Sequence, residues 1–264
     1  MSSGFNSVIA LLVMSAGSAV AADLRVCADP DNLPYSDKQQ QGLENKLAAL
    51  VGRDLGRPIH YYWIPQRAPF FKALQQGACD LVMGVPSGFQ GALTTRPYYR
   101  SSYVFASRRS KHLHIRSFDD ERLKTLRIGL QIVAQGDGDV PPAQALAHRG
   151  IVRNISWYRI NQNFLGLDRP VNLLDAVARG EIDVAIVWGP MAGYFAKHSA
   201  VPLELTPVSP QAEGPVPFAF DISMGVRPGD RKLQTELNSV IRRRQAAIHS
   251  LLEQYGVPES AATR

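Results

Sequence analysis

The chain is organised around residues 79–107, which read CDLVMGVPSGFQGALTTRPYYRSSYVFAS. The apolar run at 81–85 has no polar alternation, which is typical of a central strand buried on both faces. Pro86 ends that strand, and a loop with a dense polar and aromatic cluster at 94–99 follows. Residues 102–106 are again rich in β-formers and predict a strand that leaves this unit. This order predicts a cleft where one lobe gives way to another.

Composition places the chain among ordinary soluble globular proteins, with 264 residues of which 45% are hydrophobic and 20% charged. That length allows two lobes, each with its own core. The formal net charge is +6, and the charges are scattered apart from Arg242, Arg243 and Arg244 on a predicted helix. No nucleic-acid motif accompanies the basicity, so we expect no nucleic-acid partner. A face for an acidic protein partner and simple solubility both remain open explanations.

The first 22 residues differ from the rest of the sequence. They contain a short apolar core at 8–13, then small residues through Ala22, and no Lys, Arg, Asp or Glu. The apolar run is too short to span a bilayer, and the small residues resemble a signal-peptidase site. We therefore expect 1–22 to be a signal peptide without a basic start, and the mature chain to be periplasmic with no membrane span.

Two cysteines, Cys27 and Cys79, fit an exported protein. Both lie at or near predicted strands of the first lobe, where an oxidising compartment favours their pairing. We predict a disulfide; two buried thiols are the alternative.

Alternating strands and helices predict an α/β fold. In the first part of lobe 1, residues 23–107, we expect strands at 24–28 and 59–64 and helices at 42–55 and 70–76, all before the strand near 81–85. This order implies parallel pairing with right-handed crossovers.

Lobe 2, residues 108–210, repeats the same order. We expect strands at 126–133, 158–160 and 182–188, and helices at 141–147 and 172–179. Residues 75–84 and 177–186 share the pattern of helix, Gly, acidic residue, apolar strand, so two lobes of similar plan follow. Gly189 and Pro190 are expected to end the last strand.

Residues 211–264 are expected to return to lobe 1. They predict a strand at 218–227 and one long amphipathic helix at 231–255. The chain would then cross between the lobes twice, near 106–110 and 208–218.

Five local motifs carry a resemblance to a known family. They are CADPDNLPYS at 27–36, GLENK at 42–46, YYWIPQR at 61–67, CDLVMGVP at 79–86 and TTRPYYRSSY at 94–103. The overall pattern resembles type II periplasmic solute-binding proteins, a two-lobed fold with two crossover segments and a ligand cleft. The motifs resemble one branch, the periplasmic J proteins associated with pyrroloquinoline-quinone (PQQ) methanol and alcohol dehydrogenases (MxaJ/XoxJ-like). The resemblance implies a non-catalytic accessory role beside a quinoprotein dehydrogenase and its c-type cytochrome, with no cofactor bound by this chain.

The candidate cleft residues share a position at predicted strand ends or helix starts that face the space between the lobes. They are Asp29, Asn32, Tyr35, Glu44, Gln66, Arg67, Gly84, Pro86, Arg96, Tyr98, Gln131, Asp137 and Trp188. Structural roles compete with ligand binding at several of them. Asp29 and Asn32 are typical Asx-turn formers, and Glu44 suits the N-terminus of a helix. Tyr98 and Trp188 are equally compatible with a protein core.

One departure from ordinary amino-acid receptors concerns the loop 86–92, which has no Arg to hold a ligand carboxylate. Arg96 comes later and could substitute. A generic amino-acid ligand is therefore not expected, and the existence of another small-molecule ligand in the cleft stays open. Arg242, Arg243 and Arg244 are the first candidates for contact with a protein partner.

Catalytic and metal-binding motifs are missing from the sequence. The six histidines lack metal-ligand spacing, and there is no nucleophile elbow, Walker loop, dinucleotide fingerprint or haem-attachment motif. We expect no catalytic residue and no metal. Two other functions stay open: the substrate-binding component of an ABC transporter, and a periplasmic cleft enzyme of the dehydratase type.

Overall fold

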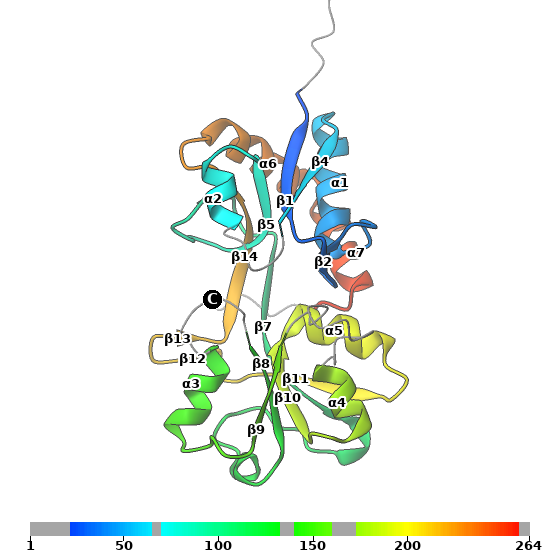
Figure 1. Cartoon of the computed structure of the whole chain (residues 1–264), viewed down its shortest axis with the longest axis vertical. Coiled ribbons are helices and arrows are strands. Elements are labelled where there is room, and N and C mark those ends of the chain that lie inside the picture. The colour runs from blue at the N-terminus through cyan, green and yellow to red at the C-terminus, as the bar shows by residue number, and fades with distance from the viewer. Residues whose placement is uncertain (1–21, 65–69, 133–139, 160–172, 259–264) are drawn as a thin grey trace, which may run out of the picture.

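One ten-stranded sheet runs through both halves of the molecule (Figure 1). The computed structural model of the chain describes residues 22–64, 70–132, 140–159 and 173–258. Within these ranges the strand order is β4-β1-β5-β14-β7-β10-β8-β9, with β6 added at β14 and β11 added at β7. The predicted signal peptide lies almost entirely outside the described residues and stays a prediction.

The first half contains the expected alternation of parallel strands and helices. Its elements are β1 (Leu24–Ala28), the short pair β2 (Asp31–Asn32) and β3 (Ser36–Asp37), α1 (Leu43–Leu55), β4 (Ile59–Trp63), α2 (Phe70–Gln75), β5 (Leu81–Pro86) and β6 (Leu93–Thr94). β1 lies between β4 and β5 and is parallel to both. Gly56 ends α1 in the left-handed conformation, as expected for a helix C-terminus.

The second half repeats this arrangement. Its elements are η1 (Arg109–Lys111), η2 (Glu121–Lys124), β8 (Ile128–Ile132), α3 (Pro141–His148), β9 (Ile155–Arg159), α4 (Leu173–Arg179), β10 (Val184–Trp188), α5 (Gly189–His198), β11 (Leu203–Pro207), β12 (Ala212–Glu213) and β13 (Val216–Pro217). β8 is parallel to β9 and β10. Gly189 and Pro190 end β10 as expected, and they also open α5, a helix that was not predicted, where Pro suits the first helical turn.

Two long strands join the halves. β7 (Tyr99–Arg108) pairs through residues 99–102 with β14 (Ala219–Val226), and through 103–107 with β10. The far end of β14 pairs with β5 in the first half. The chain therefore passes between the halves inside hydrogen-bonded strands (Figure 1). The expected lobe boundaries, 23–107, 108–210 and 211–264, stay a prediction.

The C-terminal segment forms two helices, α6 (Arg231–Arg243) and α7 (Gln245–Gln254), so the single helix predicted at 231–255 was wrong. The break falls at Arg244, whose backbone leaves helical geometry (φ −106°, ψ 17°). Both helices bury their apolar side chains in one core with α1, β1, β5 and β14. The end of the chain thus belongs to the core of the first half.

A contact between α5 and the end of α7 also crosses between the halves. The Lys197 ammonium donates to the Gln254 carbonyl at 2.9 Å, and the Tyr194 and Tyr255 rings stack at 5.8 Å. Gly193 lies so close to the Gly256 carbonyl that an added Cβ would overlap it. This contact is separate from β7 and β14.

An Arg–Asp pair occupies the same position in each half and confirms the repeated sequence pattern. In the first half, Asp80 accepts from the backbone N of Arg25 and from its guanidinium, at 2.8–3.1 Å. In the second half, Asp183 accepts from the same three groups of Arg127 at 2.9–3.0 Å. Each Asp precedes a central strand and ties it to the neighbouring parallel strand.

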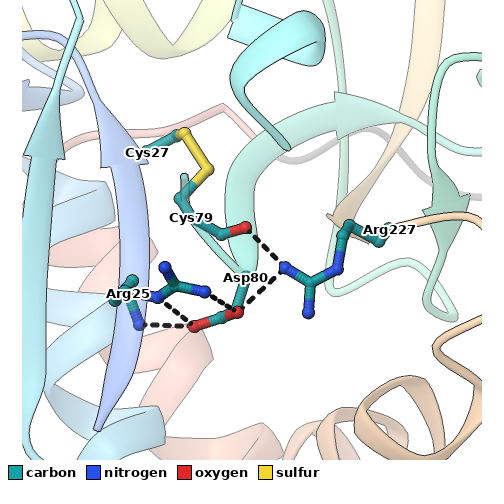
Figure 2. The surroundings of a disulfide bond; sticks show 5 residues. All are labelled: Arg25, Cys27, Cys79, Asp80 and Arg227. Carbon is teal, nitrogen blue, oxygen red and sulfur yellow. Dashed lines mark hydrogen bonds and ion pairs between the residues drawn. A yellow bond between two sulfur atoms is a disulfide. The ribbon is translucent and has the colours of Figure 1, made fainter. Parts of the chain in front are cut away.

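The first half adds two interactions to this pair, both drawn in Figure 2. Arg227 donates to Asp80 Oδ1 and to the Cys79 carbonyl, both at 3.0 Å, which brings the end of β14 into the network. Cys79 forms a disulfide with Cys27, with the two Cα atoms 5.5 Å apart. The predicted disulfide is confirmed, and it links β1 to the start of β5.

Candidate functional site

A cavity of about 690 Å³ lies between the two halves. The ends of β1 and β5 and the start of α1 supply its first wall, while the ends of β8 and β10 and the start of α5 supply the opposite wall. Within the described residues its lining is Cys27, Ala28, Asp29, Asn32, Tyr35, Ser36, Glu44, Phe70, Phe71, Val82, Met83, Gly84, Val85, Tyr99, Tyr103, Gln131, Val140, Ile186, Trp188, Met191 and Ile222. Carboxyl ends of parallel strands are the usual place for ligands in such sheets.

The loop after β1 supplies polar groups to the first wall. Asp29 is 5% exposed, and its Oδ1 accepts from the backbone N of Asp31 at 2.9 Å, which is the Asx-turn geometry considered from the sequence. Its carbonyl accepts from the Ser36 hydroxyl at 2.8 Å. The Oδ1 atom of Asn32 is buried and has no hydrogen-bond donor within the described residues. The loop is therefore fixed by Asp29 and offers one acceptor at Asn32.

Glu44 projects from the first turn of α1 toward β5. Burial, and next the nearby Asp29 carboxylate, raise the pKa of Glu44 to about 7. Within the described residues, no hydrogen-bond donor or cation contacts the Glu44 carboxylate. Its Oε1 packs against Gly84, where φ is +67° and an added Cβ would overlap the carboxylate. Glycine at position 84 thus makes room for the Glu44 carboxylate.

Aromatic side chains form the middle of the cavity. Tyr99 and Tyr103 come from β7, and Trp188 from the end of β10. The Tyr103 and Trp188 rings meet edge to face at 5.5 Å. Burial raises the pKa of Tyr103 to about 12 and also raises that of Tyr99, so both phenols stay neutral at physiological pH. They offer hydroxyl groups and ring faces together.

The wall from the second half is mostly apolar, with one amide and one thioether group. Gln131, at the end of β8, directs its amide toward Met191 Sδ at 3.1 Å. Met191 lies in the first turn of α5, the helix that the sequence prediction missed. The remaining lining on this side is apolar.

The predicted cleft residues fall into three groups. Asp29, Asn32, Tyr35, Glu44, Gly84, Gln131 and Trp188 line the cavity together. Gln66, Arg67 and Asp137 lie outside the described residues. The other three lie away from the cavity lining: Pro86 is exposed at the end of β5, Arg96 is exposed with its backbone bound to Asn238, and Tyr98 is buried with its hydroxyl at 3.2 Å from the Gly84 backbone N. The ligand-binding role of all these residues stays a prediction.

Several lining residues were missed from the sequence, notably Phe70, Phe71, Tyr99, Tyr103 and Met191. Tyr99 ends the polar and aromatic cluster at 94–99, and Tyr103 lies in the strand predicted at 102–106. Residues 95–98 do form a loop, but the strand begins at Tyr99 and not at residue 102, and this concealed that Tyr99 faces the cavity.

The three candidate partner-contact arginines have different surroundings. Arg243 and Arg244 both pair with the Asp54 carboxylate, whose side chain is 4% exposed beneath them. Hydrogen bonds from these arginines lower the pKa of Asp54. Arg242 is exposed and donates to the Ser239 hydroxyl at 2.9 Å. Arg243 and Arg244 therefore connect α6 to α1, while Arg242 presents its charge to solvent.

Two features of other binding proteins are missing from the described residues. No group of three or more His, Cys, Asp or Glu side chains in the described ranges is arranged to hold a metal ion. None of the helices in those ranges combines the length and the hydrophobicity of a membrane-spanning segment.

Comparisons with known proteins agree on one family. Protein MoxJ of Methylorubrum extorquens AM1 is 30% identical over 252 residues, which cover 90% of this chain and 82% of MoxJ. The chain belongs to the MoxJ family. No protein-family model matches the sequence.

Two solved structures of MoxJ-like proteins share the fold. Periplasmic binding protein XoxJ from Methylobacterium extorquens AM1 is 34% identical with a TM-score of 0.72, and MxaJ from Methlophaga aminisulfidivorans MPT is 27% identical with a TM-score of 0.75. In both cases the match covers 90% of this chain and 100% of the other. The expected resemblance and the type II periplasmic binding protein fold are thus confirmed.

Proposed function

We propose that this chain is a non-catalytic periplasmic accessory protein of a PQQ-dependent methanol or alcohol dehydrogenase system. The observation that carries the proposal is membership of the MoxJ family over nearly the whole chain, together with the motifs that resemble the dehydrogenase-associated J proteins. The named periplasmic relative and the sequence of residues 1–22 support export. The dehydrogenase, with its c-type cytochrome beside it, is the proposed partner.

The surface charge suggests how docking would occur. With 29 Lys and Arg against 23 Asp and Glu, the chain attracts an acidic partner. Arg242 is the member of the arginine group whose charge is not balanced by Asp54. We propose that the end of α6 contacts the dehydrogenase, mainly through Arg242. Attraction of this kind raises the on-rate and weakens with salt.

The experiment is a binding measurement between the mature chain and the purified dehydrogenase of the same organism, at low and at high salt. Arg242→Gln is expected to slow association several-fold at low salt. Arg109→Gln is the matched control, because Arg109 is also exposed, carries the same charge and lies on the other half of the molecule. Equal effects of both substitutions would show that only net charge matters.

Absence of binding, with no change in dehydrogenase activity at low salt, would overturn the accessory role. A solute receptor for a transporter would then be the better explanation. A periplasmic cleft enzyme of the dehydratase type is the second alternative. A turnover assay on prephenate-like acids tests that alternative directly.

A further inference from the structure

A depression of about 560 Å³ lies on the first half, at the corner between α6 and α7. Its described lining shares no residue with that of the cavity between the halves. α6 ends at Arg243, the backbone at Arg244 leaves helical geometry, and α7 begins at Gln245. The break leaves open space between the last turn of α6 and the first turns of α7. We call this space the α6–α7 depression.

The depression has a largely apolar floor and an open mouth. Tyr98 and Leu252 line it and are 9% and 1% exposed, so they form its floor. Arg242, Arg243 and Ala246 line it and are exposed, so they surround its mouth. Sites for small molecules enclose most of the ligand surface, whereas this depression leaves its rim open to solvent. The shape therefore favours a side chain presented by another protein surface.

Arginines give the rim of the depression its charge. Arg242 donates to the Ser239 hydroxyl at 2.9 Å, which uses one of the five N–H groups of its guanidinium. Arg243 and Arg244 both pair with the Asp54 carboxylate, so two positive charges share one negative charge. The end of α6 thus carries more positive than negative charge, and an acidic group is its complement.

Arg96 adds to the positive charge of this surface, although it is not among the described lining residues. Arg96 is exposed, and its backbone N donates to Asn238 Oδ1 at 2.7 Å. Asn238 and Arg242 are one turn apart on α6 and lie on the same face of the helix. One acid is also close, because Glu253 of α7 pairs at 3.3 Å with His249, which lines the depression. The arginines around the depression still outnumber the acids that pair there.

From these observations we propose that the α6–α7 depression receives an acidic side chain of the dehydrogenase. Its carboxylate would bind the Arg242 and Arg243 guanidinium groups through charge-assisted hydrogen bonds, and its hydrocarbon part would contact Ala246 and Tyr98. The proposal rests on the proposed function and deepens it. The attraction described above acts at long range on the association rate, whereas a side chain held in a depression slows dissociation.

The first test fills the depression without changing its charge. Ala246→Trp places an indole group at its mouth. Ala247→Trp is the matched control, because Ala247 is also exposed and is not among the described lining residues. In binding kinetics between the mature chain and the purified dehydrogenase of the same organism, Ala246→Trp is expected to raise the dissociation rate at least about tenfold and to change the association rate less than about twofold. Ala247→Trp should change neither rate by more than about twofold.

The second test keeps the charge and changes the geometry. Arg242→Lys retains the positive charge, but an ammonium group cannot form the paired hydrogen bonds of a guanidinium. Dissociation should become about three- to tenfold faster, with the association rate unchanged. Arg231→Lys, at the exposed start of α6, is the control and should leave both rates unchanged. Because Arg242→Lys is conservative, it decides the question even if Ala246→Trp does not fold.

Dissociation at the parent rate in both Ala246→Trp and Arg242→Lys, with binding retained, would overturn this proposal and leave the accessory role standing. Absence of binding by the parent chain would overturn both. Two other results would also overturn it by assigning the depression to a different occupant. Loss of self-association of the chain in Ala246→Trp would point to a second copy, and saturable binding of succinate that Ala246→Trp abolishes would point to a free dicarboxylate.

Discussion

Replacing Asp80 by Asn tests the idea that an Arg–Asp pair fixes the central strand of each half. The Asp80 carboxylate is 11% exposed and accepts four hydrogen bonds, one from a backbone N–H and three from the guanidinium groups of Arg25 and Arg227. Asparagine keeps the shape but removes the charge, and its NH₂ group points a donor at donors. Breaking a buried charge pair costs roughly 3–5 kcal/mol. Because Arg25 is 45% exposed and Arg227 31% exposed, both regain water, and we expect a loss of about 2–3 kcal/mol.

The matched variant is Asp183→Asn in the second half. Among the described residues, Asp183 accepts hydrogen bonds from one arginine, Arg127, which is 53% exposed. Its substitution should therefore lower the free energy of unfolding by less than Asp80→Asn does. Urea unfolding at pH 7, with the disulfide intact and tryptophan fluorescence as the signal, measures both variants against the parent chain.

The pH dependence supplies a second measurement. Burial raises the pKa of Asp80, but the hydrogen bonds from Arg25 and Arg227 outweigh it, so the pKa lies below its ordinary value. A carboxyl with a lowered pKa stabilises the fold above the pKa of the unfolded chain, about 3.9, and loses that contribution as the pH falls through the folded value. The difference between the parent and Asp80→Asn should thus be full at pH 7 and shrink below about pH 4. Equal losses for both variants, or a loss under about 0.5 kcal/mol for Asp80→Asn, would refute the reasoning.

Four further predictions concern the disulfide, two glycines and motion. Denatured, unreduced protein should show about zero free thiols on titration, and reduction of Cys27–Cys79, which closes a separation of 52 residues, should lower stability by about 4 kcal/mol in thermal or urea unfolding. Gly84→Ala should cost about 1–2 kcal/mol for its left-handed backbone and displace the carboxylate beside it, and unchanged unfolding would contradict this. Gly193→Ala should cost about 1–3 kcal/mol because its Cβ meets the Gly256 carbonyl, with a normal melting curve as the opposing result. X-ray scattering should show compaction when a ligand fills the cavity, and an unchanged radius of gyration with ligand bound would indicate a rigid scaffold.

Local sequence patterns predicted the alternating helices and strands, because the start and end of each element depend on residues that are close to it in the sequence. Gly77 and Gly180, each with φ +76°, end helices before Asp80 and Asp183, so the repeat was visible without tertiary information. The same reasoning ended β10 correctly at Gly189 and Pro190 but did not predict that these residues also begin α5.

The site was harder to predict because it depends on which way a side chain faces. Tyr98 and Tyr99 are neighbours on the approach to β7, and successive residues of a strand point to opposite faces. Tyr99 lines the cavity while Tyr98 packs behind β5, and no local signal distinguishes them. Pairing of Arg243 and Arg244 with Asp54 joins residues about 190 positions apart, which a single sequence cannot show.

The contact between α5 and the end of α7 has a mechanical consequence. Two adjacent strands, β7 and β14, would on their own let the halves bend and twist in several directions. The contact of Gly193 and Tyr194 with Gly256 and Tyr255 restricts this motion. A rotation of the halves about an axis far from this contact would separate its residues. We therefore expect the halves to rotate mainly about one axis, which passes near β7, β14 and this contact. Truncation of the chain before Tyr255, the residue that follows α7, would remove this contact, and we expect the halves to move more freely relative to each other as a result.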